Sequence, residues 1–266
     1  MPGQPDIQII PLGSGSKGNC TFVGTPYFGL VVDNGFSVKE LMKRLAAVRI
    51  PPSRIHAILV THEHSDHIGG VGPLARKLNV PVFLTRGTYE AGQHILKNLP
   101  EIFPVSPGET FELAELKVEP IPLPHDAREP VAYAFEWGGR RWAIFTDLGH
   151  PSHLVVERAR QCDVLLVEAN HDEELLINGP YPWSLKQRIR GRQGHLSNTQ
   201  GTSIVEAVVH PGLKGIALMH LSETNNRPEI PYALCRAALQ RLDAADIPLW
   251  VAPQERPLEG LSLKSV

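Results

Sequence analysis

The residues best suited to chemistry lie in the turn His62-Glu63-His64-Ser65-Asp66-His67, where three histidines and an aspartate fall within six positions. Imidazole nitrogen and carboxylate oxygen are ligands that suit zinc, manganese or iron. His62 and His64 are two positions apart and can bind one ion, whereas Asp66 and His67 can bind a second. A polar surface turn without function rarely has this composition. The pattern therefore predicts a metal centre.

Two elements position this turn. The apolar run 57–60 predicts a buried strand directly before it, and residues 71–78 predict a helix after it. The metal-ligating side chains then lie between a strand end and a helix start. Three further candidate ligands each follow an apolar strand, where a loop can reach a shared site: His125, Asp147 and His220.

The motif His62-x-His64-x-Asp66-His67 resembles the signature of the metallo-β-lactamase superfamily. The resemblance implies an α/β fold, the αβ/βα four-layer sandwich, in which two packed mixed β-sheets carry outer helices. It also implies two divalent ions with the following ligands: His62, His64 and His125 on the first, Asp66, His67 and His220 on the second, and Asp147 on both.

Two cations roughly 3.5–4 Å apart suit hydrolysis, because a hydroxide held between them is a nucleophile at neutral pH. We expect manganese or zinc, with iron as a third option, and a catalytic role for Asp66. The resemblance also separates branches of the superfamily, since true β-lactamases lack an aspartate bridge at the position of Asp147. Antibiotic hydrolysis is therefore not expected.

Five stretches are similar to the WalJ/YycJ-type proteins of the superfamily: residues 14–20, 168–172, 178–183, 194–198 and 220–226. One departure is Ala169, where a serine is expected. The resemblance implies a metal-dependent phosphodiesterase, a 5′-to-3′ DNA exonuclease that acts on 5′-phosphorylated ends in the cytoplasm. The alternatives are an ester, thioester or lactone hydrolase of the same fold, an RNase Z-like ribonuclease, or a binding module without catalysis.

Phosphodiester hydrolysis also needs a proton donor for the leaving oxygen. His195 is our candidate; the alternative is an ordinary histidine at a helix entry, beside the N-cap Ser197. Asp33 at a strand end is interpreted as a brace of the metal turn, with a simple turn residue as the alternative. Five residues are expected to contact the substrate: Ser16, Lys17, Asn170, His171 and Ser197.

Two features have competing interpretations. The glycine-rich loop 13–19 is consistent with a phosphate cradle or with a tight hairpin. The run 186–192 carries four cations that can bind backbone phosphates, although a solvated basic helix face is the favoured interpretation.

Composition is that of an ordinary globular protein, with 266 residues, 42% hydrophobic and 20% charged. The formal net charge of −2 means that a nucleic-acid binder needs a local basic patch. We expect no signal peptide and no membrane span, because no apolar run reaches about 18 residues. Three cysteines, an odd number without a CxxC pair, favour a reducing compartment.

The chain shows no linker, repeat or low-complexity segment, so we expect a single metallo-β-lactamase-fold domain over residues 1–266. The tail after Pro253 is expected to be loosely held. Strands are predicted at 7–12, 20–23, 29–33, 57–60, 80–84, 102–105, 110–113, 116–123, 131–137, 140–146, 164–168, 215–219 and 249–252. Helices are predicted at 37–48, 71–78, 87–96, 152–160, 197–209 and 229–242.

Overall fold

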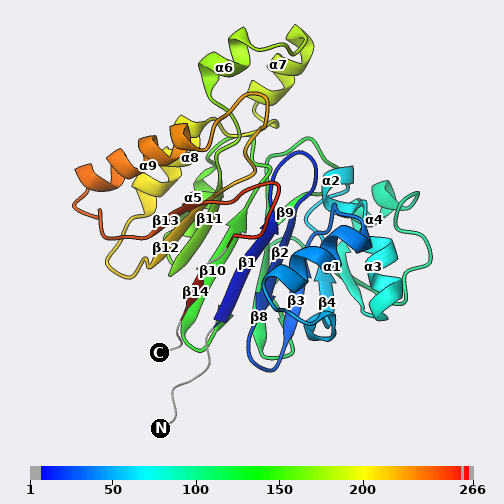
Figure 1. Cartoon of the computed structure of the whole chain (residues 1–266). Helices are drawn as coiled ribbons and strands as arrows, with labels where there is room; N and C mark the ends of the chain where they lie inside the picture. The colour runs from blue at the N-terminus through cyan, green and yellow to red at the C-terminus, as the bar shows by residue number, and fades with distance from the viewer. Residues whose placement is uncertain (1–6, 259–260, 264–266) are drawn as a thin grey trace. The chain divides into compact units, whose positions relative to one another are not determined.

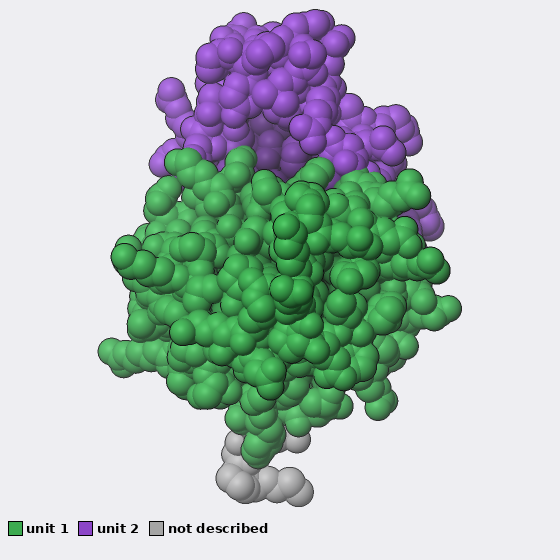
Figure 2. All heavy atoms as spheres, turned by 90° about the vertical axis from the view of Figure 1, so that its right-hand side faces the viewer, with its two compact units in different colours: residues 1–122, 127–140, 253–266 green, residues 123–126, 141–252 purple. Residues whose placement is uncertain are grey.

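The computed structural model describes residues 7–258 and 261–263. The chain divides into two compact units, which Figure 2 shows in different colours. The first comprises residues 1–122, 127–140 and 253–266, and the second comprises residues 123–126 and 141–252. Each unit carries part of the predicted ligand set, and the single-domain organisation stays a prediction.

The first unit is built on a seven-stranded sheet with strand order β14-β1-β2-β3-β4-β5-β6 (Figure 1). The neighbours from β14 to β3 are antiparallel, whereas those from β3 to β6 are parallel. The parallel strands are nearly continuous apolar runs, as expected where both faces are covered. The strands are β1 (Ile7–Gly13), β2 (Cys20–Gly24), β3 (Gly29–Val32), β4 (Ala57–Leu59), β5 (Val82–Thr85), β6 (Ile102–Val105) and β14 (Ser262–Leu263).

Helices cover one face of this sheet. Leu41 of α1 and Leu74 of α3 belong to the same buried apolar cluster as Val31 and Ile58 of the sheet. α1 begins where Ser37 Oγ accepts a hydrogen bond from the Glu40 amide (3.2 Å). The helices are α1 (Val38–Ala47), the 3₁₀ turn η1 (Pro52–Arg54), α2 (Ser65–Ile68), α3 (Val71–Leu78) and α4 (Arg86–Gly92).

An antiparallel meander in the first unit packs against the sheet, and it consists of β7 (Phe111–Leu113), β8 (Leu116–Pro122) and β9 (Val131–Trp137). The buried Tyr133 donates its hydroxyl to the Val60 carbonyl (2.9 Å). Phe111 stacks on Phe83, with 5.7 Å between the ring centroids. The first contact joins β9 to the end of β4, directly before the histidine turn, and the second joins β7 to β5.

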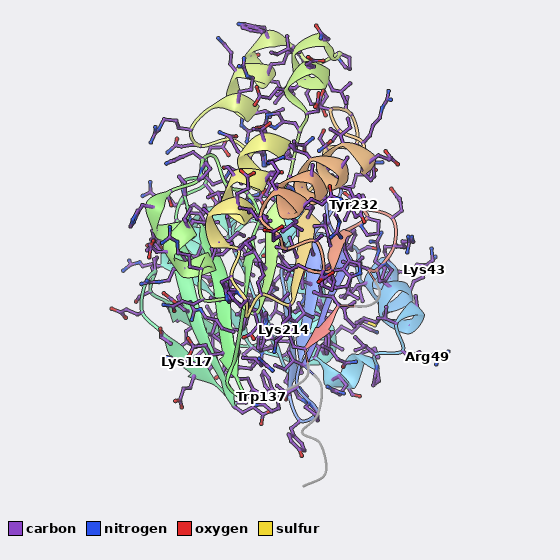
Figure 3. The ribbon with its side chains drawn as sticks, turned by 90° about the vertical axis from the view of Figure 1, so that its left-hand side faces the viewer. Lys43, Arg49, Lys117, Trp137, Lys214 and Tyr232 are labelled. Carbon is purple, nitrogen blue, oxygen red and sulfur yellow. The ribbon has the colours of Figure 1, made fainter. Side chains whose placement is uncertain are left out.

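The second unit contains parallel strands whose carboxyl ends share one edge, namely β10 (Arg140–Phe145), β11 (Val164–Glu168), β12 (Gly215–Met219) and β13 (Leu249–Val251). Lys214, labelled in Figure 3, precedes β12 and lies 3.6 Å from the Asp163 carboxylate at the opposite, amino edge. The helices are α5 (His153–Ala159), α6 (Glu173–Asn178), α7 (Trp183–Arg190), α8 (Asn198–Val208) and α9 (Glu229–Arg241). None of the described helices is long and apolar enough to cross a membrane.

The sequence analysis does not predict α6 and α7. The apolar residues of α7 are exposed or only half-buried, namely Trp183, Leu185 and Ile189. The sole buried residue of α7 is Lys186, whose ammonium donates to the carbonyls of Ile177 and Gly179 (both 2.7 Å) at the end of α6. Lys186 therefore has a structural role. Of the four cations in the run 186–192, at most three guanidinium groups are left for contacts with phosphate.

The expectation of a loosely held tail is wrong for the described residues. Gln254 accepts from the Lys17 amide (2.8 Å) and donates to the Gly18 carbonyl (2.9 Å). Further on, β14 pairs with β1. A single glutamine that satisfies the backbone of a distant loop leaves no periodic signal in the sequence.

Candidate metal centre

The histidine motif of the first unit follows β4 as predicted, but its second half, with Asp66 and His67, belongs to the short helix α2, which the sequence analysis does not predict. His62 and His67 are buried, whereas His64 and Asp66 are partly exposed. The Nε2 atom of His62 lies 3.1 Å from the Nδ1 atom of His64. Two nitrogens on one tetrahedral ion, each about 2.1 Å from it, lie about 3.4 Å apart. This pair therefore has the spacing of two ligands to one cation.

Asp33 braces the turn. It has a positive φ of 59° at the end of β3, and its carboxylate accepts from the amide and the hydroxyl of Thr61 (both 2.8 Å). The same carboxylate lies 2.8 Å from Nδ1 of His67. When Nδ1 carries the proton, Nε2 of His67 is left as a ligand atom. The contacts confirm the bracing role and exclude a simple turn residue.

Loop 13–19 is the connection of an antiparallel hairpin, with exposed Ser16 and Lys17 at its tip. Asn19, which the sequence analysis did not single out, ties the loop to the metal turn. Its Nδ2 lies 3.1 Å from Nε2 of His67 and 3.2 Å from the Asp66 carboxylate. The hairpin interpretation is confirmed, while substrate contacts of Ser16 and Lys17 stay a prediction.

In the second unit, polar side chains gather at the carboxyl edge of the parallel strands. Asp147 and His220, both buried, follow β10 and β12 with φ of 59° and 57°. The left-handed region is uncommon outside glycine and concentrates at functional sites. One ligand atom from each of four residues lies within 4.8 Å of the others: Asp147, Glu168, His195 and His220.

Glu168 organises this edge, although the sequence analysis gave it no role in the site. Its buried Oε1 lies 2.8 Å from Nδ1 of His195 and 2.9 Å from Nδ1 of His220. Three backbone amides also donate to its carboxylate, those of Asp147, Leu148 and Leu196. Burial opposes the charge, but the two histidines outweigh it and hold the pKa of Glu168 at about 2. The carboxylate thus fixes both imidazoles through Nδ1 and leaves each Nε2 for chemistry.

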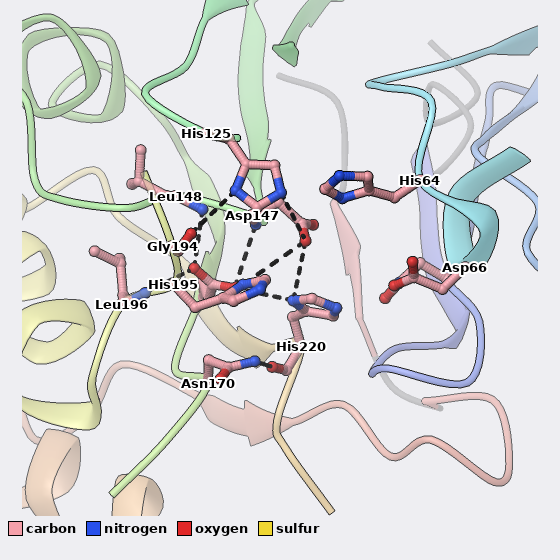
Figure 4. A network of polar contacts seen from close by, with 12 residues as sticks. His64, Asp66, His125, Asp147, Leu148, Asn170, Gly194, His195, Leu196 and His220 are labelled. Carbon is pink, nitrogen blue, oxygen red and sulfur yellow. Dashed lines mark hydrogen bonds and ion pairs between the residues drawn. The ribbon is translucent and has the colours of Figure 1, made fainter. Parts of the chain in front are cut away.

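Figure 4 shows His125, His195 and His220 around Asp147. Nδ1 of His125 bonds to the Gly194 carbonyl (3.0 Å), and its Nε2 lies 3.9 Å from the Asp147 carboxylate. Burial lowers the pKa of His125, which favours the neutral imidazole that binds metals. The side chain of His195 is 20% exposed, more than those of its two neighbours.

The other predicted substrate contacts have structural partners. Asn170 donates to the His220 carbonyl (2.9 Å), and Ser197 caps α8 through a capping box with Gln200. His171 is 2% exposed. Their direct contact with substrate stays a prediction.

His171 should make the stability of the protein depend on pH. Its Nδ1 is buried without a hydrogen-bond partner among the described residues, and burial lowers its pKa to about 4. Below pH 6.5 the unfolded chain binds the proton, whereas the folded chain does so only near pH 4, so stability falls as pH drops through this window. Between pH 7 and 4 the free energy of unfolding should fall by about 3 kcal/mol from this residue.

Urea unfolding in EDTA at several pH values measures this contribution. His171→Gln should remove that part of the slope, and the exposed His153→Gln should leave it intact. An unchanged slope in the His171 variant contradicts the interpretation.

The donor set fits divalent transition metals. Its atoms are imidazole nitrogens and carboxylate oxygens, a combination typical of zinc, manganese and iron and less so of calcium or magnesium. Cys20, Cys162 and Cys235 are buried free thiols and belong to none of the candidate ligand groups found among the described residues.

Comparison with known proteins agrees with the family resemblance of the histidine motif. The family model of the metallo-β-lactamase superfamily matches residues 13–167. The chain is 38% identical to exodeoxyribonuclease YycJ of Bacillus anthracis over 82% of this chain and 84% of that protein. It is 37% identical to exodeoxyribonuclease WalJ of Streptococcus pneumoniae, over 83% and 84%.

Solved structures are similar over nearly the whole chain. The metallo-β-lactamase fold protein YhfI of Bacillus subtilis has a TM-score of 0.73 at 15% identity, covering 97% of this chain and 100% of that one. The short form of human tRNase Z has a TM-score of 0.66 at 14% identity, over 96% and 98%. At such identity the likeness concerns the fold alone, and it confirms the αβ/βα sandwich predicted from the sequence.

Proposed function

The chain belongs to the metallo-β-lactamase superfamily and, within it, to the family of the YycJ and WalJ exodeoxyribonucleases, and from this membership we propose that it is a 5′-to-3′ DNA exonuclease. Membership makes it a metal-dependent hydrolase, and its histidine and aspartate clusters suit divalent ions. The cluster of Asp147, His195 and His220 around the buried carboxylate of Glu168 carries the proposal.

We propose that two ions, manganese or zinc, with iron as a third option, bind at the ligands that the superfamily pattern assigns: His62, His64 and His125 on one, Asp66, His67 and His220 on the other, and Asp147 on both. The donor chemistry of each unit supports this assignment. Bound cations supply activation of water and stabilisation of negative charge. The ligands would hold the two cations. The carboxylates of Asp33 and Glu168 orient the imidazoles of His67 and His220 through their Nδ1 atoms.

His195 is proposed to donate a proton to the leaving oxygen. Glu168 bonds to its Nδ1, so Nε2 is the atom available to the substrate, and the His195 side chain is more exposed than those of His125 and His220. A carboxylate behind an imidazole both orients the ring and stabilises its charged form. This arrangement supports general acid catalysis better than an ordinary helix-entry histidine.

The proposed substrate is DNA with 5′-phosphorylated ends, and the proposed location is the cytoplasm. The three buried free cysteines are compatible with a reducing compartment. Ser16, Lys17, Asn170, His171 and Ser197 remain proposed contacts to the DNA.

Linear DNA should be degraded at least about ten times faster than closed circular DNA, because an exonuclease needs an end. The assay follows loss of both forms in manganese, and a 5′-terminal label should be released before an internal one. Asp147→Ala controls for contaminating nuclease. Equal rates on both forms contradict the requirement for an end, while turnover of a chromogenic ester with no turnover of DNA favours the small-molecule hydrolase. Hydrolysis of β-lactams should be negligible.

A further inference from the structure

A cavity of about 550 Å³ lies in the second unit next to His125. It is flanked by the chain neighbours of His125, and its wall includes Gly194, whose carbonyl bonds to the His125 ring (3.0 Å). The lining residues are Pro124, Asp126, His150, Arg188, Gly191, Arg192, Gln193 and Gly194. None of these has a place in the proposed chemistry, yet two are arginines.

The imidazole of His150 contacts both the backbone carbonyl and the guanidinium group of Arg192. Nδ1 of His150 donates to the Arg192 carbonyl (2.9 Å), and its Nε2 lies 3.3 Å from Nη2 of Arg192. These two bonds are compatible with one neutral tautomer, in which Nε2 accepts from the guanidinium. His150 is thus a positioning residue that fixes the guanidinium head of Arg192 at the wall of the cavity.

Arg188 is fixed by Asp126. Its Nε lies 2.5 Å from the Asp126 carboxylate, and the backbone amide of Asp126 donates to the Gln193 carbonyl (2.9 Å). The Arg188 side chain nevertheless remains 57% exposed. Both guanidinium groups are therefore oriented before any ligand arrives, which reduces the entropy lost on binding.

Backbone contacts hold the wall itself in place. The amide of Gly149 donates to the Pro124 carbonyl (2.9 Å). A Cβ atom at Gly149 would lie 2.3 Å from the Arg192 carbonyl oxygen, so only glycine permits this approach. The cavity is built into the fold and does not depend on flexible surface side chains alone.

We infer that this cavity binds a phosphate group of the nucleic-acid strand, one that neighbours the phosphodiester being cut. The lining carries two guanidinium groups and one carboxylate, so the permanent cations outnumber the anions. Guanidinium groups bind phosphate oxygens through paired hydrogen bonds. A volume of about 550 Å³ leaves room for a phosphate group in a hollow that is open to solvent. Because each nucleotide of a strand carries a phosphate, placing one beside His125 and His195 brings the next into this region.

The inference rests on the proposed function, and Arg192→Gln tests it. The matched control is Arg160→Gln, which removes the same charge from an exposed position just after α5 in the same unit. Binding of a fluorescent single-stranded oligonucleotide with a cleavage-resistant backbone is measured by anisotropy with the metal-loaded protein, over a range of salt concentrations. Kinetics in manganese give KM and kcat for the same oligonucleotide, and thermal unfolding confirms that each variant folds.

Arg192→Gln should raise Kd and KM about tenfold with kcat within about a factor of two, and should lower the salt slope by about 1. Arg160→Gln should behave as wild type. Arg192→Lys should recover only part of the affinity because an ammonium cannot form the paired bonds. His150→Ala should show a smaller loss in the same direction.

Oligonucleotides with a 5′-phosphate and with a 5′-hydroxyl identify the phosphate. An effect confined to the 5′-phosphorylated strand assigns the cavity to the terminal phosphate, whereas equal effects assign it to an internal one. If wild type cuts DNA and Arg192→Gln matches it in Kd and KM on both strands, the cavity is a solvated basic surface and the inference is overturned. If wild type neither binds nor cuts DNA but hydrolyses a chromogenic ester, the proposed function itself fails.

Discussion

Replacing Asp147 by alanine should remove most of the bound metal and lower kcat/KM on DNA by about 10³-fold. Its carboxylate lies 3.4 Å from the His220 ring and 3.9 Å from Nε2 of His125, at the centre of the imidazole cluster. Two-metal sites contribute several kcal/mol of charge stabilisation, and each 1.36 kcal/mol is a factor of ten in rate. Metal content per chain, measured on the purified protein, and steady-state kinetics give the two readouts.

Asp147→Asn separates the loss of charge from the loss of fold. Asparagine tolerates a φ of 59° and keeps the size of the side chain, so the variant should fold and still lose metal. Asp243→Asn is the matched control, since Asp243 also has a positive φ (53°), at the end of α9. Full metal occupancy and activity in Asp147→Asn would remove Asp147 from the ligand set.

From the sequence, candidates can be named for those parts of the site whose residues are contiguous or follow apolar strands. The turn from His62 to His67 carries its ligand pattern in six positions. Asp147 and His220 follow short apolar runs that predict buried strands, and parallel strands bring their carboxyl ends to one edge. Periodicity plus this topological rule predicts such residues without coordinates.

Glu168 could not be assigned in this way, because its role depends on partners far along the chain. It ends an apolar strand, where an acidic residue is compatible with an ordinary strand end. Its bonds reach His195 and His220, 27 and 52 positions away. The sequence offers one signal, a carboxylate directly following the apolar run 164–167, and only the geometry shows that the carboxylate is buried.

The cavity beside His125 could not be predicted from the sequence for a related reason. Arg188 and Arg192 belong to a basic run that, taken alone, is typical of a solvated helix face. The cavity lies where the end of α7 and the residues after it contact Asp126 and His150, which are distant in the sequence. Local charge patterns do not reveal which cations a distant loop will orient.

His195→Ala should lower kcat on DNA by about 10²–10⁴ while metal content stays near that of wild type. General acid catalysis contributes a factor of this size. The proposed ligand set is complete without His195, whose Nδ1 is committed to Glu168. A loss of metal in this variant would make His195 a ligand, and full activity would make it an ordinary helix-entry histidine.

The leaving group distinguishes proton donation from binding of phosphate charge. A nitrophenyl phosphodiester releases a stable anion and needs little protonation, so His195→Ala should reduce its hydrolysis much less than that of DNA. Glu168→Gln should reduce kcat on DNA as well, because a glutamine side chain cannot accept all the bonds from Nδ1 of His195, Nδ1 of His220 and the backbone amides. Unlike His195→Ala, it should also weaken metal binding through His220. If the two substrates lose the same factor in His195→Ala, the ring acts on phosphate charge and the role of proton donor is wrong.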